Sequence, residues 1–173
     1  SKGNTTYIEA ENTKILIDAG NTCKYIINKL EEANCKIKTE KNAVELQAPK
    51  RLKAVDIKTL VYPGFATDLQ QIMATFLTQC KGKSLIEETI YENRFQNLFE
   101  LEKMGASFKV AEDNRKAVIK GKTLLKGTEV NATDLRGGAG LLVAGLIAEG
   151  TTTIDNISYI LRGYDYIEEK LTQ

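Results

Sequence analysis

The chain has 173 residues, with 24 Lys and Arg against 23 Asp and Glu, and it contains no histidine. This length suits one domain, or two small ones, with a real hydrophobic core. The balanced charge argues against a general nucleic-acid interface and against a polybasic membrane surface. The lack of histidine excludes His-based catalytic triads and the usual zinc sites, so acid–base chemistry has to come from carboxylates, Lys, Tyr or Cys.

The sequence has no sign of a membrane-spanning or secreted protein. No apolar run approaches the ~20 residues that span a bilayer, and the N-terminus has no secretory signal pattern. Three cysteines, Cys23, Cys35 and Cys80, lack metal-ligand spacing, and their odd number argues against a disulfide framework. We therefore expect a cytoplasmic protein that uses no metal or other cofactor and has no nucleic-acid or membrane partner.

In chain order, the first expected element is a β-hairpin formed by Thr6–Ala10 and Lys14–Asp18. A helix follows and stops at Asn34, a residue that tolerates the left-handed backbone of a helix end. A two-stranded ribbon, Lys36–Thr39 with Ala43–Leu46, comes next.

The loop before the second helix contains the most informative carboxylate. Pro63 fixes φ and Gly64 permits a backbone that bulkier residues resist, so this loop should be rigid. Thr67 with Gln70 is typical of a capping box that opens an apolar-periodic helix. Asp68 is then expected at the helix start, with its carboxylate free to face a ligand. The structural alternative is that Asp68 only complements the helix dipole.

The same pattern recurs downstream. Thr-Asp-Leu opens two predicted helices, at positions 67 and 133, and the predicted stops Gly82 and Gly150 are 68 positions apart. Arg94 and Arg162 keep the same spacing. Each helix is followed by a short strand and then by another helix; the two strands are Ser84–Glu87 and Thr152–Asp155.

This alternation of strands and helices predicts a mixed α/β fold. We predict a single domain over residues 1–173, with an atypical leading hairpin (1–21), a partial unit (22–54), a full unit (55–122) and a unit that lacks its final ribbon (123–173). The full unit ends in the ribbon Ala106–Val110 with Lys116–Lys120. One hypothesis is that the leading hairpin supplies the pairing that the missing ribbon would have given.

The segment from Thr22 to Gln173 resembles the later part of the UDP-N-acetylglucosamine enolpyruvyl transferases. The sister family that acts on shikimate phosphate shares the repeats but is less similar in its motifs. The resemblance implies an inside-out α/β barrel of repeated βαβαββ units, truncated or rearranged at its ends. The motifs that carry the resemblance are Leu52-Lys53-Ala54-Val55-Asp56-Ile57, Tyr62-Pro63-Gly64-Phe65 with Thr67-Asp68, Tyr91-Glu92-Asn93-Arg94-Phe95, Met104-Gly105-Ala106, Ala132-Thr133-Asp134-Leu135-Arg136 and Arg162-Gly163-Tyr164.

This family moves the enolpyruvyl group of phosphoenolpyruvate to the 3-hydroxyl of UDP-N-acetylglucosamine, with loss of phosphate, in peptidoglycan synthesis. The resemblance implies that Asp68 contacts the sugar hydroxyl as the proposed base and that the backbone of Ile90 binds the same substrate. It implies that Arg162 binds the carboxylate of phosphoenolpyruvate. Asp134 and Arg136 match a pair that lines the closed site.

Structural alternatives exist for several of these residues. Asp134 is also a candidate helix N-cap, and Arg136 could be an ordinary surface arginine. Glu92 and Arg94 are interpreted as a local ion pair. The glycines of Gly137–Gly140 lie within the helical pattern, which favours close helix packing over a phosphate loop. Residues assigned to packing are Tyr164, Tyr166 and Cys80.

The family's earlier domain carries a Lys-Asn start, a loop acid and further arginines, and none of these motifs is present. We therefore expect a half-site without the acid, inactive as an isolated chain, which a second chain or a missing domain would complete. The alternative is a non-catalytic folded fragment or a chimeric domain. Residues 1–20 resemble the opening strands of metallo-β-lactamase-fold hydrolases, but without histidine that metal chemistry is excluded.

Overall fold

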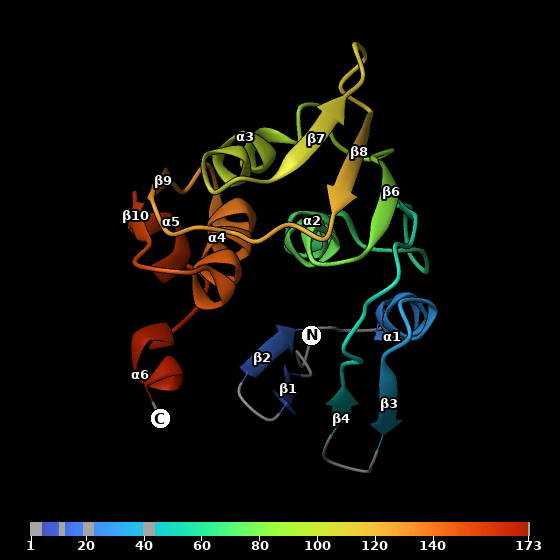
Figure 1. Cartoon of the computed structure of the whole chain (residues 1–173), viewed down its shortest axis with the longest axis horizontal. Coiled ribbons are helices and arrows are strands. Elements are labelled where there is room, and N and C mark those ends of the chain that lie inside the picture. Colours follow the sequence, from blue (N-terminus) through green and yellow to red (C-terminus); the bar gives the residue numbers. More distant parts are fainter. Residues whose placement is uncertain (1–4, 11–12, 19–22, 40–43, 173) are drawn as a thin grey trace.

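The computed structural model describes residues 5–10, 13–18, 23–39 and 44–172 of the chain. Strands and helices alternate along it (Figure 1). The strands are β1 (Thr5–Ala10), β2 (Thr13–Asp18), β3 (Lys36–Thr39), β4 (Val44–Gln47), β5 (Ile57–Lys58), β6 (Gly82–Glu87), β7 (Ser107–Val110), β8 (Lys116–Gly121), β9 (Glu129–Asn131) and β10 (Thr153–Asp155). The helices are α1 (Cys23–Glu32), the 3₁₀ turn η1 (Thr67–Leu69), α2 (Gln70–Thr78), α3 (Gln96–Lys103), α4 (Leu135–Ile147), α5 (Ser158–Leu161) and α6 (Ile167–Leu171).

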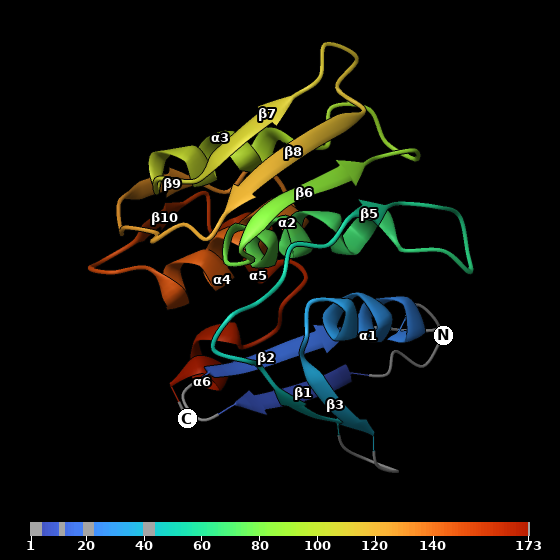
Figure 2. The same ribbon diagram turned by 45° about the vertical axis from the view of Figure 1, so that its right-hand side comes forward.

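A four-stranded sheet in the order β5-β6-β8-β7 forms one outer layer. β5 is parallel to β6, and the other neighbours are antiparallel. The inward residues of β6 and β8 are small or apolar, as Ile86, Ala117 and Ile119 show, and their outward neighbours include lysines. This alternation directs one face of the sheet to the helices. α2 and α3 pack on that face, and α4 lies against both helices (Figures 1 and 2).

The predicted repetition is visible in the strand pairing. α2 connects the parallel strands β5 and β6, and α4 connects the parallel strands β9 and β10. The predicted left-handed helix stops are confirmed, because φ is +72° at Asn34 and +99° at Gly105. The predicted ribbons are also present as β3–β4 and β7–β8, both antiparallel. The residue boundaries of the units remain a prediction.

The core lies between the inner helices and the sheet. Its apolar residues include Leu77, Ile86, Leu98, Leu101, Met104, Ile119 and Leu141, all almost completely buried. Cys80 is buried too, and its burial, with Cys35 nearby, raises the pKa of the Cys80 thiol to about 12. This confirms Cys80 as a core thiol.

Two sequence-based expectations are wrong: one concerns the end of the second helix, and the other concerns the role of the leading hairpin. The second helix stops at Thr78, and Gly82, the expected stop, begins β6 with φ +125°. The leading hairpin does form, as β1 and β2. However, in the described residues these strands are hydrogen-bonded only to each other, and β1 lies beside β4 without joining its sheet. The hairpin therefore does not act as a replacement ribbon in a larger ladder.

No helix in the described ranges is long and apolar enough to cross a bilayer.

Candidate functional site

The loop that precedes Asp68 is closed by tight backbone packing. Leu60 N donates to Phe65 O at 3.0 Å, and a Cβ on Gly64 would lie 2.3 Å from Leu60 Cβ. Only glycine therefore fits at position 64 without a shift of the loop. The result is a compact turn that leads directly into η1 and Asp68.

The predicted capping box is wrong. Thr67 makes no cap; its hydroxyl donates to Glu88 Oε2 at 3.0 Å, and the side chain of Gln70 is completely buried. The Thr67 hydroxyl satisfies the buried carboxylate of Glu88 and does not cap the helix, because a buried carboxylate needs a hydrogen-bond donor. The chain consequently enters α2 through the 3₁₀ turn η1, which places Asp68 on the surface.

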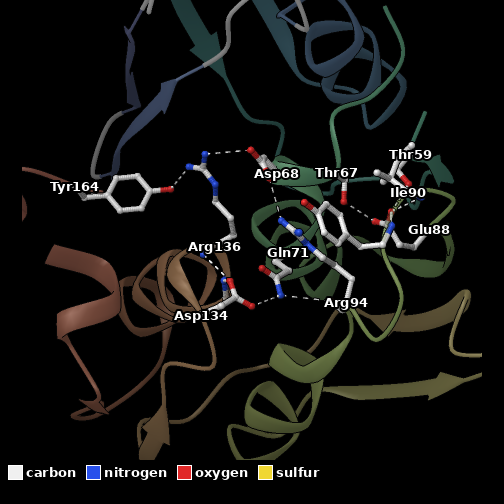
Figure 3. Close-up of polar contacts among 12 residues, drawn as sticks. Thr59, Thr67, Asp68, Gln71, Glu88, Ile90, Arg94, Asp134, Arg136 and Tyr164 are labelled. Carbon is white, nitrogen blue, oxygen red and sulfur yellow. Dashed lines mark hydrogen bonds and ion pairs between the residues drawn. The ribbon is translucent and has the colours of Figure 1, made fainter. Parts of the chain in front are cut away.

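Asp68 contacts two arginines that lie far from it in the sequence. Its Oδ1 is 3.0 Å from Arg94 Nη2, and its Oδ2 is 3.3 Å from Arg136 Nη2. Figure 3 shows the carboxylate between the two guanidinium groups. The side chain of Asp68 remains 55% exposed, whereas that of Arg94 is only 14% exposed. The arrangement is an accessible carboxylate held by a more buried cationic frame.

The expected local ion pair between Glu92 and Arg94 is not formed. Glu92 pairs with Arg115 at 3.1 Å, and the guanidinium of Arg94 lies 4.6 Å from the centre of the Tyr91 ring. This cation–π contact and the Asp68 carboxylate direct Arg94 away from Glu92. Arg94 is therefore a site residue that the sequence interpretation missed.

Asp134 is the N-cap of α4, as predicted. Its Oδ1 accepts hydrogen bonds from Arg136 N at 2.7 Å and Gly137 N at 2.9 Å, while Oδ2 accepts from Gln71 Nε2 at 3.0 Å. Burial alone would raise the pKa of Asp134, but these hydrogen bonds and the charge of Arg94 hold it below its usual value. Asp134 caps the helix and also belongs to the site. The Gln71 amide that donates to Asp134 also donates to the backbone carbonyl of Arg94, and so connects the two residues.

Asp134→Ala is expected to lower the free energy of unfolding at neutral pH by about 1 kcal/mol, through loss of the cap. A lowered pKa means that the ionised side chain stabilises the fold above the unfolded-state pKa, and that this stability is lost as pH falls through the folded-state pKa. The deficit of the variant should thus be constant above about pH 5 and shrink below about pH 4.

Urea unfolding of both proteins between pH 3 and pH 7 measures this deficit. Asp155→Ala serves as the control, because the exposed side chain of Asp155 makes no hydrogen bond in the described part of the chain. A deficit that persists unchanged at pH 3 would contradict the assignment of stability to the ionised form.

Arg136 lies in the first turn of α4, yet it is not an ordinary surface arginine. Its Nη1 donates to Tyr164 Oη at 3.2 Å, and its Nη2 contacts Asp68. Burial would lower the pKa of Arg136, but the bonds to Tyr164 and Asp68 raise it above the usual value. Tyr164, expected to serve only in packing, therefore also positions the Arg136 guanidinium.

The other two predicted site residues are placed differently. Ile90 N donates to Glu88 Oε1 at 2.9 Å, on the segment that leads to Arg94. Arg162 directly follows α5 as its C-cap residue, and its guanidinium lies 5.9 Å from the centre of the Tyr159 ring. Across the described residues, no hydrogen bond or ion pair joins Arg162 to Asp68, Asp134 or Arg136. The structure thus brings Asp68, Asp134 and Arg136 into one network and leaves Arg162 outside it.

The network offers a defined chemistry. One exposed carboxylate can accept a proton from a bound hydroxyl, and two guanidiniums leave an excess of positive charge for an anionic ligand. No cluster of side chains that could hold a metal ion occurs in the part of the chain that is described. A signal for Arg94 was present in the sequence, since it keeps the repeat spacing with Arg162; Gln71 had no comparable signal.

The family model described as EPSP synthase (3-phosphoshikimate 1-carboxyvinyltransferase) matches residues 6–171. The chain therefore belongs to the EPSP synthase family. The match begins within β1, so it includes most of the leading hairpin, for which the sequence suggested a different resemblance.

Within this family, the chain is similar to UDP-N-acetylglucosamine 1-carboxyvinyltransferases. It is 50% identical over 149 residues to the enzyme of Halothermothrix orenii, covering 86% of this chain and 35% of that protein. It is 51% identical over 146 residues to enzyme 1 of Caldanaerobacter subterraneus subsp. tengcongensis, covering 84% and 35%. The chain thus spans about a third of the length of these relatives, and the resemblance stated from its motifs is confirmed.

Solved structures agree on the fold. The enolpyruvyl transferase NikO from Streptomyces tendae is 28% identical with a TM-score of 0.77, covering 85% of this chain and 34% of that one. An EPSP synthase from Acinetobacter baumannii is 19% identical with a TM-score of 0.58, covering 88% and 35%. The predicted α/β architecture is therefore confirmed as part of the enolpyruvyl transferase fold.

Proposed function

We propose that this chain forms the UDP-sugar-facing half of an enolpyruvyl transferase site, which moves the enolpyruvyl group of phosphoenolpyruvate to the 3-hydroxyl of UDP-N-acetylglucosamine. The observation that carries the proposal is the Asp68 carboxylate held between Arg94 and Arg136 in a chain about half identical to such enzymes. The general acid and the remaining cations would come from polypeptide outside these 173 residues.

The roles follow from what the reaction requires. Addition of the sugar hydroxyl to the enol carbon needs a base, and Asp68 is the exposed carboxylate of the network. The two arginines that contact Asp68 orient its carboxylate, and they present positive charge to the anionic substrates. Asp134 orients the start of α4, and so the backbone from which Arg136 extends.

The proposal assigns substrate contacts to two further residues. The backbone of Ile90 would bind the UDP-sugar, because this partly exposed residue lies on the segment between Glu88 and Arg94. Arg162 would bind the carboxylate of phosphoenolpyruvate through its planar guanidinium, for which its exposed position leaves it available. The same proposal implies a cytoplasmic protein, in line with the free thiols of Cys35 and Cys80.

A second candidate function is that of a folded fragment or chimeric domain without activity. The leading hairpin favours it, since β1 and β2 pair only with each other in the described residues. Such a chain would keep the fold and have no defined affinity for either substrate.

Titration of the 173-residue chain with UDP-N-acetylglucosamine, followed by calorimetry and amide NMR, separates the two. A half-site shows saturable binding with shifts at Asp68 and Ile90, while an inert fragment shows none. In the same preparation with phosphoenolpyruvate, phosphate release should stay at background, because the family's acid-loop motif does not occur in the sequence. Release above a trace would contradict the half-site assignment; the full-length Halothermothrix orenii enzyme is the positive control for the assay.

A further inference from the structure

Glu88, which directly follows β6, is a completely buried carboxylate with no cation beside it in the described residues. Four neutral donors satisfy it. Oε1 accepts from Thr59 Oγ1 at 2.8 Å, from Ile90 N at 2.9 Å and from Tyr91 N at 3.0 Å, and Oε2 accepts from Thr67 Oγ1 at 3.0 Å. A buried carboxyl group is tolerated only when donors satisfy it in this way, so the segments that contain Thr59, Thr67 and Ile90–Tyr91 must meet around Glu88 in one geometry.

Three of these four bonds reach the segments that carry the site. Thr67 immediately precedes Asp68, and Ile90 and Tyr91 lie on the segment that continues to Arg94. The Glu88 side chain therefore joins the Asp68 turn to the loop whose arginine holds the Asp68 carboxylate (Figure 3). Glu88 is itself fixed, because its backbone N–H donates to Arg115 O on the β8 side at 2.7 Å.

We infer that Glu88 is a positioning residue that sets Asp68 and the Ile90 backbone in register for one substrate. It touches neither the exposed carboxylate nor the arginines, and it acts through Thr67 and the Ile90 and Tyr91 N–H groups. The predicted effect of Glu88 on substrate binding rests on the proposed function. The coupling of Glu88 to the Asp68–Arg94 pair does not depend on any ligand.

The variants follow from the hydrogen bonds. Thr67→Val removes only the bond between Glu88 and the Asp68 turn, and Thr67→Ser keeps the hydroxyl. Glu88→Gln can retain the network, because its amide oxygen accepts the three Oε1 bonds and its amide nitrogen donates to the Thr67 hydroxyl. Glu88→Ala removes all four. Thr75→Val is the matched control: it also removes a buried hydroxyl bond, to Gly140 O at 2.9 Å, but neither partner of that bond is hydrogen-bonded to Glu88 or Asp68 in the described residues.

Two measurements on the 173-residue chain test the inference. The first is the NMR signature of the Arg94 guanidinium, which reports the Asp68 pair without any ligand. The second is the dissociation constant for UDP-N-acetylglucosamine. Thr67→Val should average the resolved Arg94 guanidinium signals and weaken binding roughly ten-fold, the effect of one lost hydrogen bond. Thr67→Ser and Glu88→Gln should stay within about two-fold of the parent, and Thr75→Val should lower thermal stability without changing either readout.

The outcomes separate the inference from the function it rests on. If the parent chain binds no UDP-N-acetylglucosamine, the proposed function fails, while the Arg94 signature still decides the role of Glu88. If a folded Thr67→Val or Glu88→Ala protein keeps the parent Arg94 signals and affinity, Glu88 positions nothing and the inference is overturned. It is equally overturned if Thr75→Val changes the Arg94 signals as strongly as Thr67→Val does.

Discussion

Asp68→Ala is expected to weaken the binding of UDP-N-acetylglucosamine to the chain by one to two orders of magnitude. A hydrogen bond from the sugar hydroxyl to a carboxylate contributes about 1.5–3 kcal/mol, so its loss weakens binding roughly 10- to 150-fold. The variant also leaves Arg94 and Arg136 without the group that orients them. Isothermal titration calorimetry with the UDP-sugar measures the loss.

Charge alone predicts the opposite change for a simple anion. Removal of Asp68 leaves two uncompensated guanidiniums, which should attract inorganic phosphate more strongly than in the parent. A fall in affinity for the UDP-sugar together with a rise for phosphate therefore identifies a specific contact. An equal fall in affinity for both ligands would indicate local unfolding of the variant and not the loss of a specific contact.

Glu92→Ala is the matched control for this experiment. It also removes a carboxylate that pairs with an arginine, Arg115 at 3.1 Å, but its side chain is 79% exposed and lies outside the Asp68 network. The Glu92→Ala variant should bind the UDP-sugar with the affinity of the parent chain. Unchanged binding by Asp68→Ala itself would remove the main support for the transferase half-site.

Gly138→Ala is expected to destabilise the chain and disturb the site together. A Cβ at this position would lie 2.6 Å from Cγ1 of Ile160, which is completely buried, and 3.1 Å from Ala132 Cβ. Overpacking of this kind costs about 1–3 kcal/mol and exceeds the ~1 kcal/mol that alanine gains over glycine in a helix. The steric clash displaces α5, which contains Ile160 and is followed by Tyr164, the hydrogen-bond partner of Arg136.

Gly145→Ala provides the comparison on the same helix, α4. Its added Cβ would meet Thr152 atoms at 3.4 Å or more, an ordinary contact, so the helical gain of up to ~1 kcal/mol should appear. Urea unfolding should therefore give opposite signs for the two variants, with Gly138→Ala the less stable. Equal stability of both would show that α5 adjusts freely and that these glycines do not set the distance between the helices.

Several local features of the fold could be predicted from single segments. The left-handed stops at Asn34 and Gly105 and the cap at Asp134 depend on residues only a few positions apart, so short patterns contain the necessary information. The α/β alternation and the internal repeat were visible for the same reason. The family resemblance added the site residues Asp68 and Arg136, which the structure brings into contact.

The partners of those residues could not be predicted in this way. Thr67 and Gln70 match a capping box, yet the Thr67 hydroxyl bonds to Glu88, 21 positions away. Arg94 has Glu92 as a local partner in the sequence, yet it bonds to Asp68 at a separation of 26 positions. In both cases a buried or converging group offered a stronger interaction than the neighbouring residue did.

The sequence by itself thus determined the elements, their repetition and the carboxyvinyl transferase family, because these depend on local backbone preferences and on the order of motifs. Only the tertiary structure decided that Asp68 meets Arg94 and Arg136, the latter 68 positions away, and that Glu88 joins their segments. Hydrogen bonds and ion pairs require contact in space, and that contact arises only when α2, α4 and the sheet pack together.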